Sequence, residues 1–275
     1  MPEEEETSGK LSVSEISVSF GGITALDGIS LEACQGEVLG IIGPNGAGKT
    51  TLFNVICGFV KPASGTMRWR DRALDGVRPN QLASLGIART LQGVGLFTDL
   101  TVRENVMVGA QRFRRAGVVG AMLARPRADR DERGLGERAA AALGRVGCAD
   151  MAEARPGQLP YAAQKRVALA RALACEPDLL LLDEPAGGLD SDEMSALADT
   201  IRSLGSSIAV MLVDHHMDLV TSVCDRMVVL DFGRVIAAGD PATVRQDPQV
   251  LEAYLGRDAE TTDTALASGR ADAQR

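Results

Sequence analysis

Residues 43–50, with the sequence Gly-Pro-Asn-Gly-Ala-Gly-Lys-Thr, decide the fold class of this chain. They match the pattern G-x-x-x-x-G-K-[ST], whose backbone amides and lysine surround phosphate oxygens. The flanks are those that the pattern requires. Residues 38–42 are apolar on both faces, which is typical of a buried strand, and residues 51–58 have the length of a helix that ends at a glycine. A glycine-rich turn that binds nothing is the alternative, and these flanks disfavour it.

The loop predicts a site for the phosphates of a nucleotide. The start of the following helix adds the positive end of its dipole. Lys49 would place its charge at the β- and γ-phosphates, and the hydroxyl of Thr50 would bind Mg²⁺. The expected nucleotide-binding residues are Gly43, Pro44, Asn45, Gly46, Ala47, Gly48, Lys49, Thr50 and Thr51.

A second apolar run, Leu179–Leu182, ends in two acids, Asp183 and Glu184. Open α/β sheets bind their ligands beyond the carboxyl ends of the strands. Hydrolysis of a nucleotide needs an acid that holds Mg²⁺ and a group that orients the attacking water. We assign the metal to Asp183 and the water to Glu184. A strand that merely ends in two acids is the alternative, and the phosphate loop makes it the weaker one.

Further apolar runs at residues 208–214 and 227–231 predict more strands, and we expect a helix capped at Ser191 or Asp192 ahead of them. Strands that alternate with helices predict an α/β fold with a parallel sheet covered on both faces.

Two other segments depart from this alternation. Residues 11–35 alternate apolar and polar around Gly21-Gly22, which predicts an antiparallel β layer at the start of the fold. Residues 111–157 contain ten Arg and no Lys, and we expect a helical insertion there. Its arginines would form a solvated helical face or approach anionic headgroups, and we favour the solvated face.

Composition excludes several classes of function. The chain has 275 residues, a net charge of −8 and few aromatic residues, which disfavours nucleic acid as a partner. No apolar run approaches the roughly 18 residues of a membrane span. The first ten residues lack the basic start and apolar stretch of a secretory signal, so we expect a cytoplasmic protein. Five cysteines without a C-x-x-C pair, and only two histidines, disfavour zinc.

Taken in order, the motifs resemble those of the ATP-binding subunits of ATP-binding cassette (ABC) transporters, over residues 11–256. The resemblance implies a P-loop NTPase core, ATP and Mg²⁺ as cofactors, and ATP hydrolysis. Gln92, in RTLQGVGLF, stands at the Q-loop glutamine, a catalytic residue and metal ligand. Asp190, in GGLD, stands at the D-loop. Phe20 stands where an aromatic ring stacks on adenine, and His215 stands at the switch histidine.

The residues themselves support His215, because it follows the expected strand 208–214 and so faces the crevice that holds the phosphates. It could donate a hydrogen bond to the γ-phosphate. For the adjacent His216 we favour a solvated loop histidine. The alternative for Gln92 is polar filler in a loop.

Residues 85–110 and 235–256 resemble the longer of the two ATPases in importers of branched-chain amino acids. Urea-type importers and lipopolysaccharide exporters share parts of this pattern, and the insertion argues against the exporters. The resemblance implies membrane permease subunits, a second related ATPase in a heterodimer, an indirect link to a solute-binding protein, and a peripheral place on the inner face of the membrane. We expect an acidic, disordered segment at 1–10, an ABC ATPase domain at 11–256 with a helical subdomain at about 93–175, and a disordered tail at 257–275.

One motif departs from the family. Its signature loop, L-S-G-G-Q, or L-A-Y-G-Q-Q in this subtype, binds the γ-phosphate held by the partner subunit. Pro160 lacks a hydroxyl and an amide hydrogen, and Ala162 replaces a glycine. We expect the ATP site that uses this loop to be weakened and the site with Lys49 and Glu184 to stay active. A poorly hydrolysing regulatory subunit is the alternative. The aligned residues are Leu159, Pro160, Tyr161, Ala162, Ala163 and Gln164.

ABC proteins of DNA repair and of translation are less consistent with the chain. The former need a long coiled coil between the two nucleotide motifs, and no sustained heptads separate Lys49 from Asp183. The latter carry two phosphate loops, whereas this chain has one.

Overall fold

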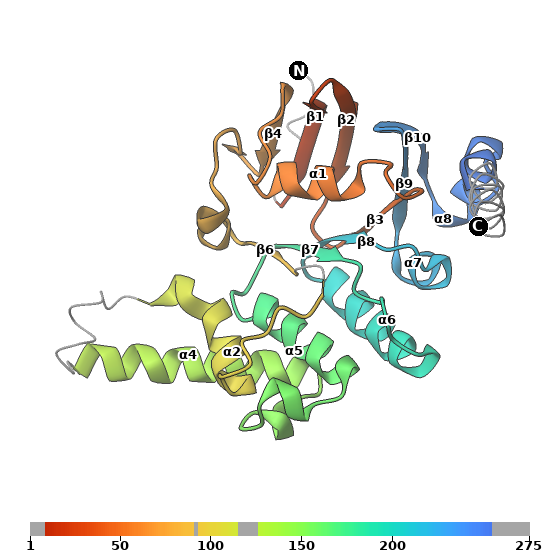
Figure 1. Cartoon of the computed structure of the whole chain (residues 1–275). Coiled ribbons are helices and arrows are strands. Elements are labelled where there is room, and N and C mark those ends of the chain that lie inside the picture. Colours follow the sequence, from red (N-terminus) through yellow and green to blue (C-terminus); the bar gives the residue numbers. More distant parts are fainter. Residues whose placement is uncertain (1–8, 91–92, 115–125, 255–275) are drawn as a thin grey trace, which may run out of the picture.

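The computed structural model describes residues 9–90, 93–114 and 126–254 (Figure 1). In chain order the strands are β1 (Leu11–Phe20), β2 (Ile23–Ala33), β3 (Val38–Ile42), β4 (Ser64–Trp69), β5 (Arg72–Ala73), β6 (Ile87–Arg89), β7 (Leu179–Asp183), β8 (Ala209–Val213), β9 (Arg226–Asp231) and β10 (Arg234–Gly239). The α-helices with defined bounds are α1 (Lys49–Ile56), α2 (Val102–Gly109), α4 (Pro126–Arg145), α5 (Tyr161–Leu173), α6 (Ser191–Gly205), α7 (Met217–Val223) and α8 (Pro241–Val244), and the described residues 248–254 are also helical. Short 3₁₀ helices are η1 (Pro79–Leu85), η2 (Ala110–Phe113), η3 (Ala149–Met151) and η4 (Pro156–Gln158).

The central sheet has six strands in the order β10-β9-β3-β8-β7-β6. All neighbours are parallel except β9 and β10. Every residue of β3, β7 and β8 is buried, as the apolar runs predict for strands covered on both faces. The expected parallel sheet is confirmed. Strand β10 was not predicted, because an edge strand with no fully buried residue needs no continuous apolar run.

The predicted antiparallel layer is confirmed as a second sheet, of order β2-β1-β4-β5. Strands β1 and β2 meet at the Gly21-Gly22 turn, where Phe20 pairs with Ile23. Helix α1 lies between this sheet and the central sheet (Figure 1). One apolar core fills this space and includes Leu52 and Phe53 of α1.

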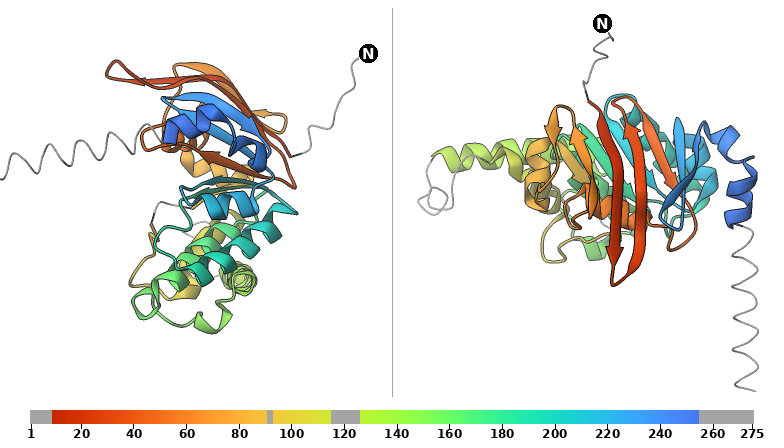
Figure 2. Two further views of the ribbon diagram at one scale, coloured as in Figure 1. Left: turned by 90° about the vertical axis from the view of Figure 1, so that its right-hand side faces the viewer. Right: turned by 90° about the horizontal axis from the view of Figure 1, so that it is seen from above.

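Helices α5, α6 and α7 cover the opposite face of the central sheet (Figures 1 and 2). A second apolar core lies between these helices and the central sheet. Strand β7 contributes to both cores, because successive side chains of a strand point to opposite faces of the sheet. Leu179 and Leu181 lie in the core around α1, and Leu180 and Leu182 lie in the helical core. The expected helical insertion, residues 111–157, contains most of η2 and, after it, α4, η3 and the start of η4 in its described part. Helix α4 extends away from the sheets (Figure 2). No helix in the described ranges is long and apolar enough to cross a membrane.

Candidate nucleotide site

The phosphate loop connects β3 to α1, and its glycines are sterically required. Gly43 and Gly48 both have left-handed φ angles, of 145° and 104°. A Cβ atom on Gly43 would overlap the carbonyl oxygen of Leu230, and one on Gly48 would overlap that of Ala25. The loop therefore packs directly on the backbones of β9 and β2, which only glycine permits.

The start of α1 has no acidic side chain in its first turn and no side-chain cap. Amides at a helix start lack intrahelical partners, and the positive end of the helix dipole favours an anion there. Lys49 is buried and its Nζ donates to the carbonyl oxygens of Gly43, at 2.7 Å, and Pro44, at 2.9 Å. Thr50 is exposed and Thr51 is half-buried. A hydroxyl, a lysine and several amides thus gather where the sequence predicts phosphates.

Asp183 ends β7 and is only 3% exposed. Its Oδ2 accepts a hydrogen bond of 2.7 Å from Nη2 of Arg89, the last residue of β6. Nη1 of the same guanidinium donates to Oδ1 of Asn54 on α1, also at 2.7 Å. This network ties the expected metal ligand to the helix of the phosphate loop. Arg89 is not among the residues expected from the sequence, although an arginine directly after apolar strand residues is seldom buried without a partner.

Glu184 follows Asp183 in a left-handed backbone conformation, with φ of 48°. Its amide donates to the carbonyl oxygen of Val213 at 2.8 Å, which ties it to the end of β8. A left-handed conformation is uncommon outside glycine, so surrounding contacts must hold it.

Asp214 follows β8 and is buried, and its carboxylate connects two loops. Oδ2 accepts the amide of Ala186 at 3.0 Å, and Oδ1 accepts both the amide of His216, at 3.0 Å, and its ring Nδ1, at 2.6 Å. The interpretation of His216 as a solvated loop histidine is therefore wrong. This contact could not be predicted from residue spacing, which does not show that the Asp214 carboxylate is buried and points toward His216.

His215 differs from its neighbour. Its side chain is 57% exposed, and its Nδ1 lies 3.9 Å from Oδ1 of Asp214. The two histidine rings are 4.1 Å apart. Within the described part of the chain, one group of three or more His, Cys, Asp or Glu side chains lies close enough together to share a metal ion. It consists of Asp214, His215 and His216. Asp214 already accepts hydrogen bonds from Ala186 and His216, so a structural role explains this group without a metal ion.

The remaining predicted residues lie on other elements. Phe20 ends β1 and is 51% exposed, in the hairpin whose Ala25 contacts Gly48. Asp190 caps α6, since its Oδ1 accepts the amide of Glu193 at 2.9 Å. The expected cap at Ser191 or Asp192 is thus one or two residues too late. Gln92 lies outside the described residues.

The signature segment forms the start of α5. Pro160 is the residue before the helix and makes no side-chain cap. Tyr161 is 46% exposed, whereas Ala163 is buried. Gln164 turns back to donate from Nε2 to the carbonyl oxygen of Leu159 at 3.0 Å. Ala162 lies half-buried one residue into the helix.

The strand order explains which residues come together. Strand β8 lies between β3 and β7, and all three run parallel. Their carboxyl ends lead into the phosphate loop, into Asp183 and Glu184, and into Asp214 and His215. The expected phosphate, metal and switch residues therefore lie along one edge of the sheet, and the helix of the signature segment covers the face below it (Figure 1).

Comparison with known proteins gives the family. A model described as "ABC transporter" matches residues 26–187, and one described as "Branched-chain amino acid ATP-binding cassette transporter" matches residues 234–260. The high-affinity branched-chain amino acid transport ATP-binding protein LivG of Salmonella typhimurium is 38% identical over 90% of this chain and 97% of its own length. The high-affinity branched-chain amino acid transport ATP-binding protein BraF of Pseudomonas aeruginosa is 37% identical over 90% of this chain and 97% of its own length.

Solved structures agree with these relatives. The ADP conformation of the ATP-binding cassette MJ1267 has a TM-score of 0.78 and 29% identity, and the alignment covers 90% of this chain and 98% of that one. A nucleotide-free cassette of an ABC transporter has a TM-score of 0.77 at the same identity, over 89% of this chain and 98% of the other. The chain therefore belongs to the ATP-hydrolysing, ATP-binding subunits of ABC transporters.

Proposed function

We propose that this chain is the ATPase subunit of an importer for branched-chain amino acids or a similar small polar solute. The observation that carries the proposal is the single sheet edge that holds the phosphate loop, Asp183, Glu184 and His215. Relatives named for branched-chain amino acid transport over nearly their whole length support the choice of solute.

In this proposal the loop amides and Lys49 bind the ATP phosphates, and Phe20 stacks on the adenine. Glu184 orients the attacking water, and His215 and Gln92 contact the γ-phosphate region. Catalysis is then largely positioning and neutralisation of charge.

The donor set fits Mg²⁺, which prefers hydroxyl and carboxylate oxygens. Thr50 is exposed and offers a hydroxyl at the start of α1, and Asp183 offers a carboxylate whose Oδ2 accepts the hydrogen bond from Arg89. Together with Gln92 these residues would hold the ion, whose chemistry is to neutralise charge on the β- and γ-phosphates.

A second, related ATPase completes the unit. The signature segment of each subunit would face the ATP held by the other, with Asp190 at the interface. Pro160 and Ala162 weaken the site that uses this chain's signature segment, whereas the site with Lys49 and Glu184 turns over. If the chain is instead a poorly hydrolysing regulatory subunit, replacing Glu184 should not change the rate of ATP hydrolysis at either site.

The permease would bind at the cavity of about 330 Å³ between the end of α1, η1, α2 and α5. Phe59 and Val108 line it and are 59% and 38% exposed, which favours an apolar partner segment. In this proposal the ABC ATPase domain, residues 11–256, lies on the inner face of the membrane, with the helical subdomain of about 93–175 on the permease side. Solute selection then belongs to the permease and a solute-binding protein.

The proposal is tested by uptake of labelled leucine, isoleucine and valine in cells that lack this subunit, with urea uptake measured in parallel. We expect wild-type protein to restore amino-acid uptake and the variants Lys49→Ala and Glu184→Gln to fail. Restored urea uptake with unchanged amino-acid uptake would support the urea-type alternative. Full complementation by Glu184→Gln would support the regulatory one.

A further inference from the structure

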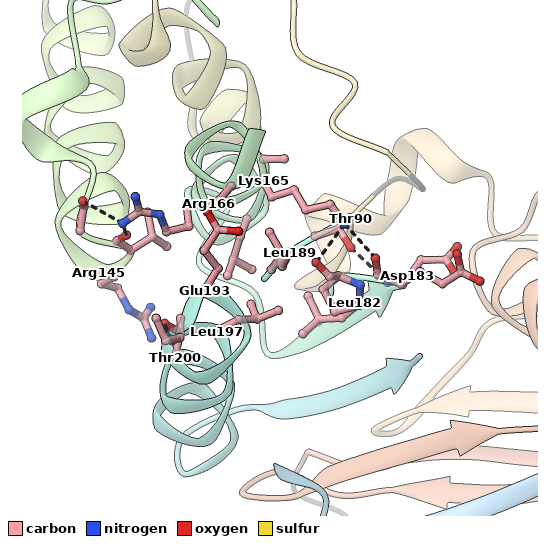
Figure 3. Close-up of a pocket in the computed structure, with 18 of the residues that line it drawn as sticks. Thr90, Arg145, Lys165, Arg166, Leu182, Asp183, Leu189, Glu193, Leu197 and Thr200 are labelled. Carbon is pink, nitrogen blue, oxygen red and sulfur yellow. Dashed lines mark hydrogen bonds between the residues drawn. The ribbon is translucent and has the colours of Figure 1, made fainter. Parts of the chain in front are cut away.

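Lys165 on α5 connects the helical side of the molecule to the residue proposed to orient water. Its Nζ donates hydrogen bonds to the carbonyl oxygens of Glu184, at 3.1 Å, and Pro185, at 3.0 Å. Figure 3 shows Lys165 on α5 and Asp183 at the end of β7 lining the same cavity. One ammonium group thus holds two successive backbone carbonyl groups, one on each side of Pro185.

A second contact comes from the preceding turn of the same helix. The aromatic ring of Tyr161 lies 5.5 Å from Nζ of Lys165, within range of a cation–π interaction. The same ring packs on Gly188, where an added Cβ would lie 3.0 Å from Cε1 of Tyr161. Two residues of α5, four positions apart, therefore contact the segment 184–188 at both ends.

Burial and nearby charges act on the Lys165 ammonium in opposite directions. Burial lowers the pKa of Lys165, while the negative charges of Asp214 and Glu184 oppose that shift. The two carbonyl oxygens replace part of the water that the ammonium loses, and the carboxylates favour its charged form through their negative charge. Other titratable groups around the cavity are Arg145, Arg166, Asp192 and Glu193, and Arg166 is itself bonded to the carbonyl oxygens of Val146 and Gly147.

The backbone of Glu184 needs such support, because its φ of 48° lies in a region that side chains other than glycine rarely adopt. The amide of Glu184 is fixed by Val213, and Lys165 fixes its carbonyl. With both ends of the residue held, the direction of its side chain is set by β8 on one side and by α5 on the other.

We infer that Lys165 is a positioning residue for Glu184, and that through it the orientation of α5 controls hydrolysis at this chain's own ATP. The inference rests on the proposed role of Glu184. Helix α5 begins with the signature segment, which is proposed to face the other ATP. Lys165 would therefore link the two ATP sites within one subunit. The adjoining cavity, of about 480 Å³, leaves room for α5 to shift or for a longer side chain at this position.

The test measures ATP hydrolysis by the subunit purified with the proteins that co-purify with it. The variants are Lys165→Met, which keeps the length and removes the donors, Lys165→Arg, which keeps the charge, and Lys61→Met as the control at an exposed lysine. We expect Lys165→Met to lower kcat by about ten- to a hundredfold with little change in KM for ATP, because the reacting geometry is lost and binding is not. Lys165→Arg should retain most of the activity, and Lys61→Met all of it.

The same substitution in a Glu184→Gln background separates positioning from a merely structural role. If Lys165 acts through Glu184, Lys165→Met causes no further loss there. An equal fold-loss in both backgrounds, or a rise in KM with unchanged kcat, would overturn the inference. Should Lys165→Met fail to fold, Lys165→Leu, which also removes the donors, takes its place with the same expectations. A Glu184→Gln variant with wild-type kcat would instead overturn the proposed role of Glu184 itself.

Discussion

The guanidinium of Arg89 lies 2.7 Å from the carboxylate of Asp183, and both side chains are removed from solvent, at 11% and 2% exposure. The pair joins neighbouring strands β6 and β7 at the edge that carries the proposed metal ligand. A buried pair adds little net stability, because desolvation offsets the attraction, but the loss of one partner leaves a buried charge unpaired.

We therefore predict that Arg89→Met lowers the free energy of unfolding by about 3–5 kcal/mol. The double variant Arg89→Met/Asp183→Asn should recover a large part of this loss, since no unpaired charge then remains. Urea unfolding measures both. The matched control is Arg234→Met, which breaks the exposed pair of Arg234 with Asp27 and should cost about 1 kcal/mol or less. Equal losses at the two positions would contradict the argument.

The glycines of the phosphate loop differ in how much space a side chain would have, and the sequence pattern does not show this difference. Gly43→Ala should prevent binding of a fluorescent ATP analogue, because the new Cβ meets the carbonyl oxygen of Leu230. At Gly46 the same substitution meets nothing within 4 Å. It should retain binding and cost about 1 kcal/mol of stability, because a side chain at φ of 79° is strained. Similar affinities for the two variants would show that loop packing does not decide phosphate binding.

The two adjacent histidines should separate stability from activity. His216→Ala removes a hydrogen bond to a buried carboxylate, which is worth about 1.5–3 kcal/mol, and should lower the unfolding midpoint by a corresponding amount. His215→Ala removes an exposed ring and should leave that midpoint unchanged while hydrolysis falls. Thermal unfolding and ATPase rates measured on both variants check this pair of expectations, and a reversed pattern would exchange the two roles.

Alkaline pH should destabilise the fold through buried thiols. Desolvation raises the pKa of Cys175 to about 11 and that of Cys224 to about 12, from an ordinary 9.0. Since the folded-state pKa values are raised, the stabilisation is complete below pH 9 and is lost as the pH rises towards 11 and 12. Each thiol contributes a slope of about −1.4 kcal/mol per pH unit in that window. Urea unfolding from pH 8 to 10.5 should show this slope, and Cys175→Ala should reduce it.

Much of the fold follows from local pattern, because β3, β7 and β8 are buried on both faces and so require continuous apolar runs. The position of the phosphate loop can also be predicted from the sequence, because its glycines, Lys49 and Thr50 match a known pattern. Pairings across elements do not follow, since the contacts of Arg89 with Asp183 and of Lys165 with Glu184 join residues far apart in the chain. The spacing of residues along the sequence does not show which charged side chains are buried next to each other in the fold.

The signature segment offers the sharpest test of the proposed asymmetry. Pro160 precedes α5 and has no side chain that can cap the helix or reach a phosphate. Pro160→Ser should stabilise the start of α5 by about 1 kcal/mol, because a serine hydroxyl accepts one of the first helical amides. Combined with Ala162→Gly, it should also raise the ATPase rate of the assembled transporter, since the weakened site regains a hydroxyl and a close backbone approach.

The increase predicted for the signature variants should persist when Lys49→Ala inactivates this chain's own phosphate site, because the restored signature segment faces ATP held by the partner subunit. Steady-state hydrolysis by the four combinations of these variants measures this directly. If Lys49→Ala alone left transport intact while the equivalent change in the partner abolished it, the active and weakened sites would have to be exchanged.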